Sequence, residues 1–61
     1  IYPNGISVRL SNRQTGVVVG QHRGLPGRPI VRVLARDMDD VRAEEIDLAR
    51  HPTLFIEAVL S

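Results

Sequence analysis

The chain has 61 residues and a net charge of +1, and 43% of its residues are hydrophobic, which excludes a disordered chain. It contains no cysteine, which excludes disulfides and thiolate metal sites. No apolar run approaches the roughly 18 residues that a membrane span requires. A chain of this length buries only about 60% of its unfolded surface, so we expect one small domain of marginal stability over residues 1–61.

The first third of the chain predicts a β-hairpin. Residues 6–10 alternate strictly between apolar and polar, which is the pattern of a half-buried strand, and the polar residues 11–14 follow as the hairpin loop. Residues 15–21 form the second expected strand, and three consecutive valines make it apolar on both faces, as in a central strand. Gly16 and Gly20 within it predict a bulge or a sharp bend that helps the sheet to curl.

A third strand is expected over residues 28–35, after a loop at residues 21–27 that contains two glycines and one proline. Val31 and Val33 fall on one face of this strand, which we interpret as its core side. Pro29 cannot donate a ladder hydrogen bond, so it marks the beginning of the strand or a sheet edge.

The last third of the chain is more ambiguous. We expect a polar loop at residues 36–43 and a short fourth strand at 44–49, with a helix over 37–50 as the rival interpretation because several apolar residues there have helical spacing. A glutamate falls on the apolar side of that helix, which favours the strand. A turn at residues 51–54 then leads into the last strand, residues 55–60.

Five short strands in 61 residues predict an all-β fold, either a small SH3-like barrel or a curled antiparallel meander. The chain begins at Ile1 rather than methionine and shows no signal-peptide pattern. We therefore interpret it as a domain cut from a longer multidomain protein, and we expect that protein to be cytoplasmic.

No catalytic or metal-binding constellation stands out among the residues. His22 and His51 each lie beside turn residues, far apart in the sequence. The acidic segment 37–40 lacks the later glycine and the closing glutamate of a calcium loop. The serines have no matching His–Asp pattern, and no glycine-rich phosphate loop precedes a helix. We therefore expect no catalytic residue, no metal, no cofactor and no enzymatic activity in this chain.

An autonomous nucleic-acid-binding barrel is the alternative function. All eight basic residues are arginines, and six of them precede the first acidic residue. Single-stranded nucleic acids are bound on exposed aromatic side chains, however, and only Tyr2 and Phe55 are aromatic here. A net charge of +1 is also a weak electrostatic footprint, so the composition argues against this alternative.

The third and last expected strands each carry a second apolar set around one charged residue. If both sets point away from the core, they form an exposed apolar patch with Arg32 paired to Glu57 at its centre. Small monomeric domains seldom leave such patches uncovered. The other interpretation, in which one set lies beneath residues 37–52, stays open. This candidate docking face consists of Ile30, Arg32, Leu34, Phe55, Glu57 and Val59.

A set of short motifs also extends in order over the whole chain. They are Tyr2-Pro3-x-Gly5-x-x-Val8-x-Leu10-Ser11, Gly16-Val17-Val18-Val19, Arg28-Pro29-Ile30-Val31-Arg32-Val33-Leu34, Glu45-Ile46-Asp47-Leu48 and Phe55-Ile56-x-x-Val59-Leu60. This ordered set resembles the region that follows the catalytic domain in many bacterial HD-GYP proteins, which are cyclic di-GMP phosphodiesterases of signalling systems.

The resemblance implies a parent enzyme that hydrolyses cyclic di-GMP at a metal centre in a helical catalytic domain. The His-Asp metal motif and the Gly-Tyr-Pro signature of that family do not occur in this chain, so no catalytic role carries over to any residue. The resemblance therefore implies a non-catalytic accessory or docking domain. Its expected partner is the catalytic domain of the parent protein or a second copy of itself. We expect no membrane contact, and nucleic acid is the partner only in the alternative function.

Overall fold

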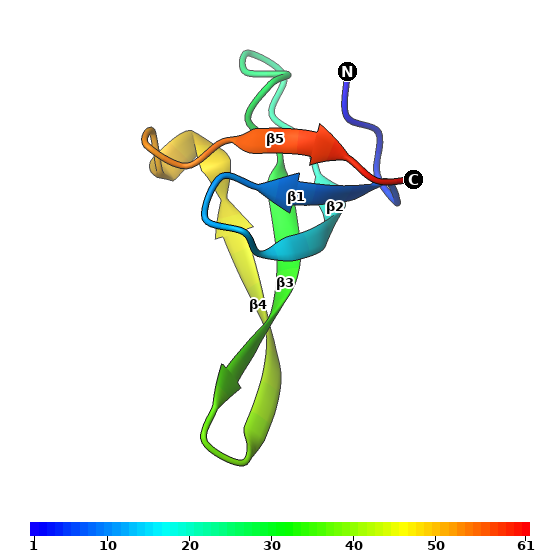
Figure 1. The fold of residues 1–61 in the computed structure, drawn as a ribbon. Coiled ribbons are helices and arrows are strands. Elements are labelled where there is room, and N and C mark those ends of the chain that lie inside the picture. The colour runs from blue at the N-terminus through cyan, green and yellow to red at the C-terminus, as the bar shows by residue number, and fades with distance from the viewer.

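The computed structural model describes all 61 residues and contains one antiparallel sheet of five strands (Figure 1). The strands are β1 (Ser7–Leu10), β2 (Thr15–Gly20), β3 (Ile30–Asp37), β4 (Asp40–Asp47) and β5 (Ile56–Val59), and a single 3₁₀ turn, η1 (Leu48–Arg50), precedes β5. Their order in the sheet is β4-β3-β2-β1-β5. The predicted all-β class is confirmed. No helix is long and apolar enough to cross a membrane.

A small core fills the inside of the curled sheet. β2 lies between β1 and β3, as its run of valines predicted, and a register shift between Val18 and Gly20 supplies the expected bulge. The alternation of the first and third strands correctly predicted which of their side chains face inward, and β2 and η1 each contribute one more buried apolar side chain. The fully buried cluster is Val8, Leu10, Val18, Val31, Val33 and Leu48.

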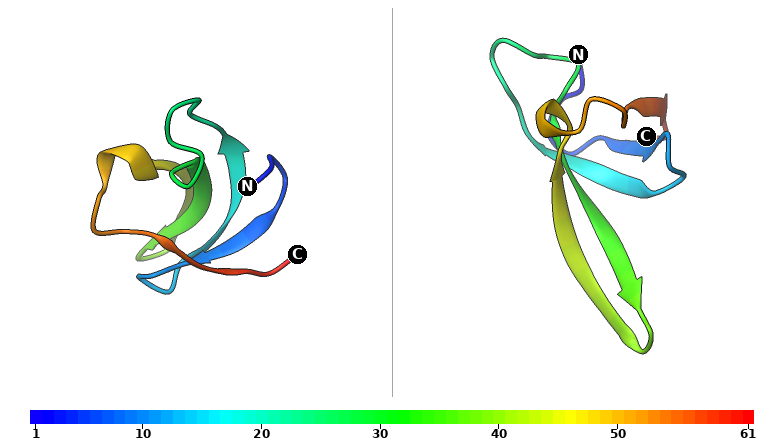
Figure 2. Two further views of the ribbon diagram at one scale, coloured as in Figure 1. Left: turned by 90° about the horizontal axis from the view of Figure 1, so that it is seen from above. Right: turned by 90° about the vertical axis from the view of Figure 1, so that its left-hand side faces the viewer.

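The curled sheet is closed without a ladder between its two edge strands, β4 and β5 (Figure 2). Arg28, just before β3, bridges the gap by donating hydrogen bonds to the carbonyl oxygens of Pro52, at 3.0 Å, and of Leu54 in the segment before β5. The backbone N–H of Leu48 also donates to the carbonyl of Pro29 over 3.1 Å, which fixes η1 against the start of β3. One guanidinium group therefore holds the closing segment in place.

We expect Arg28→Ala to lower the free energy of unfolding by about 1–3 kcal/mol, because partly buried carbonyl groups lose a charged donor and no other side chain replaces it. Chemical denaturation followed by circular dichroism measures the effect. Arg13→Ala is the matched control, because Arg13 is exposed in the turn after β1. Equal stability of the two variants would contradict this role for Arg28.

The prediction of a loop at residues 36–43 is wrong. β3 and β4 continue past the other strands as a two-stranded hairpin, paired as far as Asp37 and Asp40, and this extension gives the molecule its longest dimension of 38 Å (Figure 1). Both faces of such a ribbon meet water, so its residues need no apolar alternation and carry no strand signal. The rival helix over 37–50 is also wrong, since only η1 at its end is helical. We call residues 35–44 the hairpin arm.

Candidate docking face

The six residues of the predicted docking face lie on strands that are not neighbours. β3 and β5 are separated in the sheet by β2 and β1. Arg32 instead forms an ion pair with Glu45 on β4, and Glu57 forms one with Arg9 on β1, each over 2.8 Å. The expected pair between Arg32 and Glu57 is therefore wrong, because alternation indicates the face of a side chain but not which strand lies beside it.

A β-bulge in the pairing of β1 with β5 changes the composition of the face again. Leu10 is opposite Ile56, but Arg9 is opposite Ala58, so one residue of β5 has no partner of its own. Such an extra residue reverses the inward and outward alternation beyond it. Leu60 consequently lies on the outer surface of the sheet, although simple alternation places it on the same side as Ile56.

Val59 shows the other consequence of the bulge. It is opposite Val8, a residue of the buried cluster, so it belongs to the inner side of the sheet at its rim and not to the outer surface. Phe55 precedes β5 and is exposed outside the sheet, while Ile30 is half-buried at the start of β3. Of the six predicted residues, Arg32 and Leu34 are the two that line one common hollow on the outer surface.

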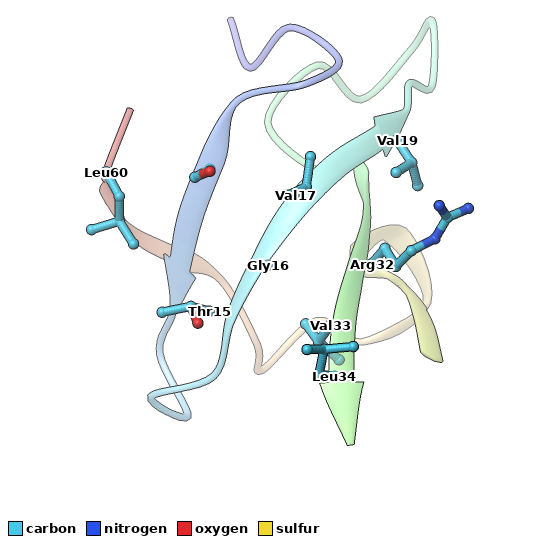
Figure 3. A pocket seen from close by; sticks show the side chains of 9 residues that line it. Thr15, Gly16, Val17, Val19, Arg32, Val33, Leu34 and Leu60 are labelled. Carbon is cyan, nitrogen blue, oxygen red and sulfur yellow. The ribbon is translucent and has the colours of Figure 1, made fainter. Parts of the chain in front are cut away.

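A row of side chains crosses the outer surface from one edge towards the other. Ser7 is opposite Val17, and Val17 is opposite Arg32, whose guanidinium reaches Glu45 on the edge strand. The backbone N–H of Leu60 donates to the carbonyl of Ser7 over 2.8 Å and so extends the row past β1. We call this surface the outer face, and its side chains are Ser7, Thr15, Val17, Val19, Arg32, Leu34 and Leu60 (Figure 3).

The outer face is hollowed into a groove of about 570 Å³. Its apolar side chains are open to solvent: Val17 is 39% exposed, Leu34 69% and Leu60 48%. The alternation of the sequence singled out Leu34, but it gave no means of finding Leu60, which reaches this surface through the bulge. Apart from Arg32, the groove presents only apolar side chains and two hydroxyl groups, so it is suited to binding rather than to chemistry.

The arginines of the first half are largely engaged within the chain itself. Arg9 and Arg32 are paired with glutamates, and Arg28 donates to backbone carbonyls. Their partners lie at least 13 residues away in the sequence, so composition alone does not reveal that these arginines are already engaged. Arg13 and Arg23 make neither a side-chain ion pair nor a side-chain hydrogen bond.

A second polar cluster joins the loop after β2 to η1. His22 Nε2 donates to Asp47 Oδ1 over 2.7 Å, and the backbone N–H of Ala49 donates to the same oxygen over 3.0 Å. His51 Nδ1 donates to the carbonyl of Asp47, also over 3.0 Å. No three His, Cys, Asp or Glu side chains gather closely enough to hold a metal ion. The cluster fastens two segments that no ladder joins.

We expect acid to weaken the fold through Asp47. The hydrogen bond from His22, assisted by the N–H of Ala49 and the charges of His22 and Arg50, holds the pKa of Asp47 below its ordinary value of 3.8, although desolvation opposes the shift. A depressed carboxyl pKa contributes stability that is complete above the unfolded value and is lost as pH falls through the folded value. Thermal melts of the wild type between neutral pH and pH about 2 should therefore show a melting temperature that decreases once the pH drops below about 4.

The variant Asp47→Asn is the matched control for this titration, because an amide oxygen still accepts from Ala49 but carries no charge. The melting temperature of the variant should be lower than that of the wild type at neutral pH, and the two melting temperatures should become equal in acid. Parallel curves would show that other carboxyl groups account for the acid sensitivity.

The sequence was compared with known families, curated proteins and solved structures. Residues 7–61 match a family described as a KOW domain associated with HD domain, and this range includes every strand and η1. No curated protein and no solved structure shows a significant match. The match extends over far more than half of the chain and agrees with the five-stranded fold. The chain therefore belongs to the family of KOW domains that are associated with HD domains.

Proposed function

We propose that this chain is the non-catalytic accessory domain of an HD-domain phosphohydrolase, and that the substrate of the parent enzyme is cyclic di-GMP. The family match supports the association with an HD domain. The ordered motifs that resemble the tail of HD-GYP proteins support the finer assignment to cyclic di-GMP. On this proposal the domain contributes a protein contact, and the chemistry belongs to the HD domain.

Beside the family match, the proposal rests on one structural observation, which is the open apolar groove of the outer face. Its one charged residue, Arg32, is already paired. Exposed ion pairs of this kind contribute only about 0–1 kcal/mol to stability, so they do not account for the apolar side chains around them. Apolar surface left open beside satisfied charges is typical of a surface that another protein covers.

Hydrolysis assays on separate pieces of the parent enzyme test this proposal. The isolated chain should not hydrolyse cyclic di-GMP, whereas the metal-loaded HD domain should do so without it. Hydrolysis by the isolated chain, or a parent protein without an HD domain, would overturn the proposal.

The arginine contacts weigh against the alternative of nucleic-acid binding, because Arg9, Arg28 and Arg32 already have partners within the chain. We expect no binding of single- or double-stranded probes at physiological salt in fluorescence anisotropy. Micromolar binding with a steep salt dependence would favour the alternative instead.

A further inference from the structure

We propose that the outer face binds a second copy of this chain, in a two-fold dimer whose long axes run antiparallel. The inference rests on the proposed function, because it names the occupant of the same face. Two observations support it. The two ends of the molecule carry opposite charges, and an apolar groove lies between them.

One end of the molecule is the acidic hairpin arm. Residues 35–44 contain four carboxylates and two arginines, a net charge of −2. The arm also exposes apolar side chains, since Met38 at its turn is 98% exposed and Val41 is 51% exposed. It has only two strands, and a two-stranded ribbon in water is marginally stable by itself. Contact with another surface would therefore stabilise the arm.

The opposite end of the molecule is basic. The loop at residues 21–29 and the segment 47–54 lie at this end, away from the arm (Figures 1 and 2). Together they contain Arg23, Arg28 and Arg50 against Asp47, a net charge of +2. The charges are thus separated along the 38 Å axis, with the groove between the two ends.

This distribution of charge selects one arrangement of two copies. A two-fold axis can place one outer face on another either with the long axes parallel or with them antiparallel. The parallel arrangement brings arm to arm and basic end to basic end, so like charges repel at both ends. The antiparallel arrangement sets each arm against the basic end of its partner and stacks the two grooves at the centre. Charge complementarity therefore favours a closed, antiparallel dimer.

The outer face also supplies the apolar centre that such a dimer needs. Leu34, at the base of the arm, and Val17, in the middle of the sheet, are both open to solvent and lie on the same surface. A stable interface covers about 800 Å² of each partner, which is about a fifth of the 4349 Å² that the chain exposes. A face that runs across the sheet and onto the arm can provide that area.

Sedimentation equilibrium of the 61-residue chain is the first test. We expect a monomer–dimer equilibrium, with Leu34→Ser abolishing the dimer while the circular dichroism spectrum stays that of the wild type. Phe55→Ser is the matched control, because Phe55 is 53% exposed but lies outside the outer face, and this variant should dimerise like the wild type. A chain that stays monomeric up to millimolar concentration would overturn the proposal, and so would equal effects of the two substitutions.

Reversing the charges of the two ends separates this dimer from other assemblies. Asp39→Arg with Asp40→Arg makes the arm basic, and Arg23→Glu with Arg50→Glu makes the other end acidic; none of these side chains makes a hydrogen bond or ion pair in the monomer. Each double variant alone should dimerise about tenfold or more weakly than the wild type, because its own ends now repel. An equimolar mixture should regain the dimer, since each arm again meets an end of opposite charge. Failure of the mixture to associate would overturn the antiparallel arrangement.

The tests of the dimer and of the accessory function can fail separately. A monomeric chain whose Leu34 becomes protected from solvent only in the full-length parent, as measured by labelling of Leu34→Cys, would show that the HD domain occupies the outer face. That result overturns the dimer and leaves the accessory function standing. Hydrolysis of cyclic di-GMP by the isolated chain overturns the accessory function whatever the oligomeric state.

Discussion

We expect Val31→Asp to leave the chain unfolded at neutral pH. Val31 is fully buried in β3, opposite Val18 on one side and Ile46 on the other. The whole apolar core has six residues, and a domain of this size is stabilised by on the order of 3–9 kcal/mol. An unpaired carboxylate in such a core costs several kcal/mol, and no basic side chain lies within the cluster to compensate it.

The measurement is the far-ultraviolet circular dichroism spectrum together with the dispersion of amide NMR signals. Leu34→Asp is the matched control, because Leu34 lies on the same strand with its side chain 69% exposed on the other surface. The control should stay folded. A folded Val31→Asp would mean that the inner and outer surfaces of β3 are assigned the wrong way round.

Gly16→Ala should have the second largest effect. Gly16 lies between Val8 on β1 and Val33 on β3, and both of these residues belong to the buried cluster. A Cβ atom at this position would be 2.7 Å from Val31 Cγ1 and 2.8 Å from Val33 Cγ1, and it would also run into the backbone carbonyl of Arg32. Overpacking of a close-packed core costs about 1–3 kcal/mol, which is a large part of the stability of so small a domain.

Chemical denaturation of Gly16→Ala and Gly24→Ala measures this effect against a control. Gly24 is in the loop after β2, and an added Cβ there meets no atom within 4 Å. We expect the Gly24 variant to unfold at the wild-type denaturant concentration or above it, since alanine restricts the unfolded chain. A Gly16 variant as stable as the Gly24 variant would show that β2 and β3 move apart to accommodate the added Cβ atom without loss of stability.

The sequence by itself determined which residues form the core of the first and third strands. Alternation with a period of two is a local property, so it correctly placed Val8, Leu10, Val31 and Val33 inside. The valine run likewise predicted that β2 is a central strand, and β2 does lie between β1 and β3, although its outward side chain Val17 stays 39% exposed. The family resemblance followed from the same local motifs, read in their order along the chain.

The tertiary structure alone decided which residues meet on the outer face. The partners of Arg32 and Glu57 depend on the order of the strands, and they lie 13 and 48 residues away in the sequence. A single unpaired residue in β5 brought Leu60 to the outer surface, and local alternation carries no trace of such a bulge. The hairpin arm was not predicted for a related reason. Both faces of this ribbon are exposed, so its sequence has no apolar alternation. Side-chain pairing across a sheet is set by contacts between distant segments, and these exist only once the chain has folded.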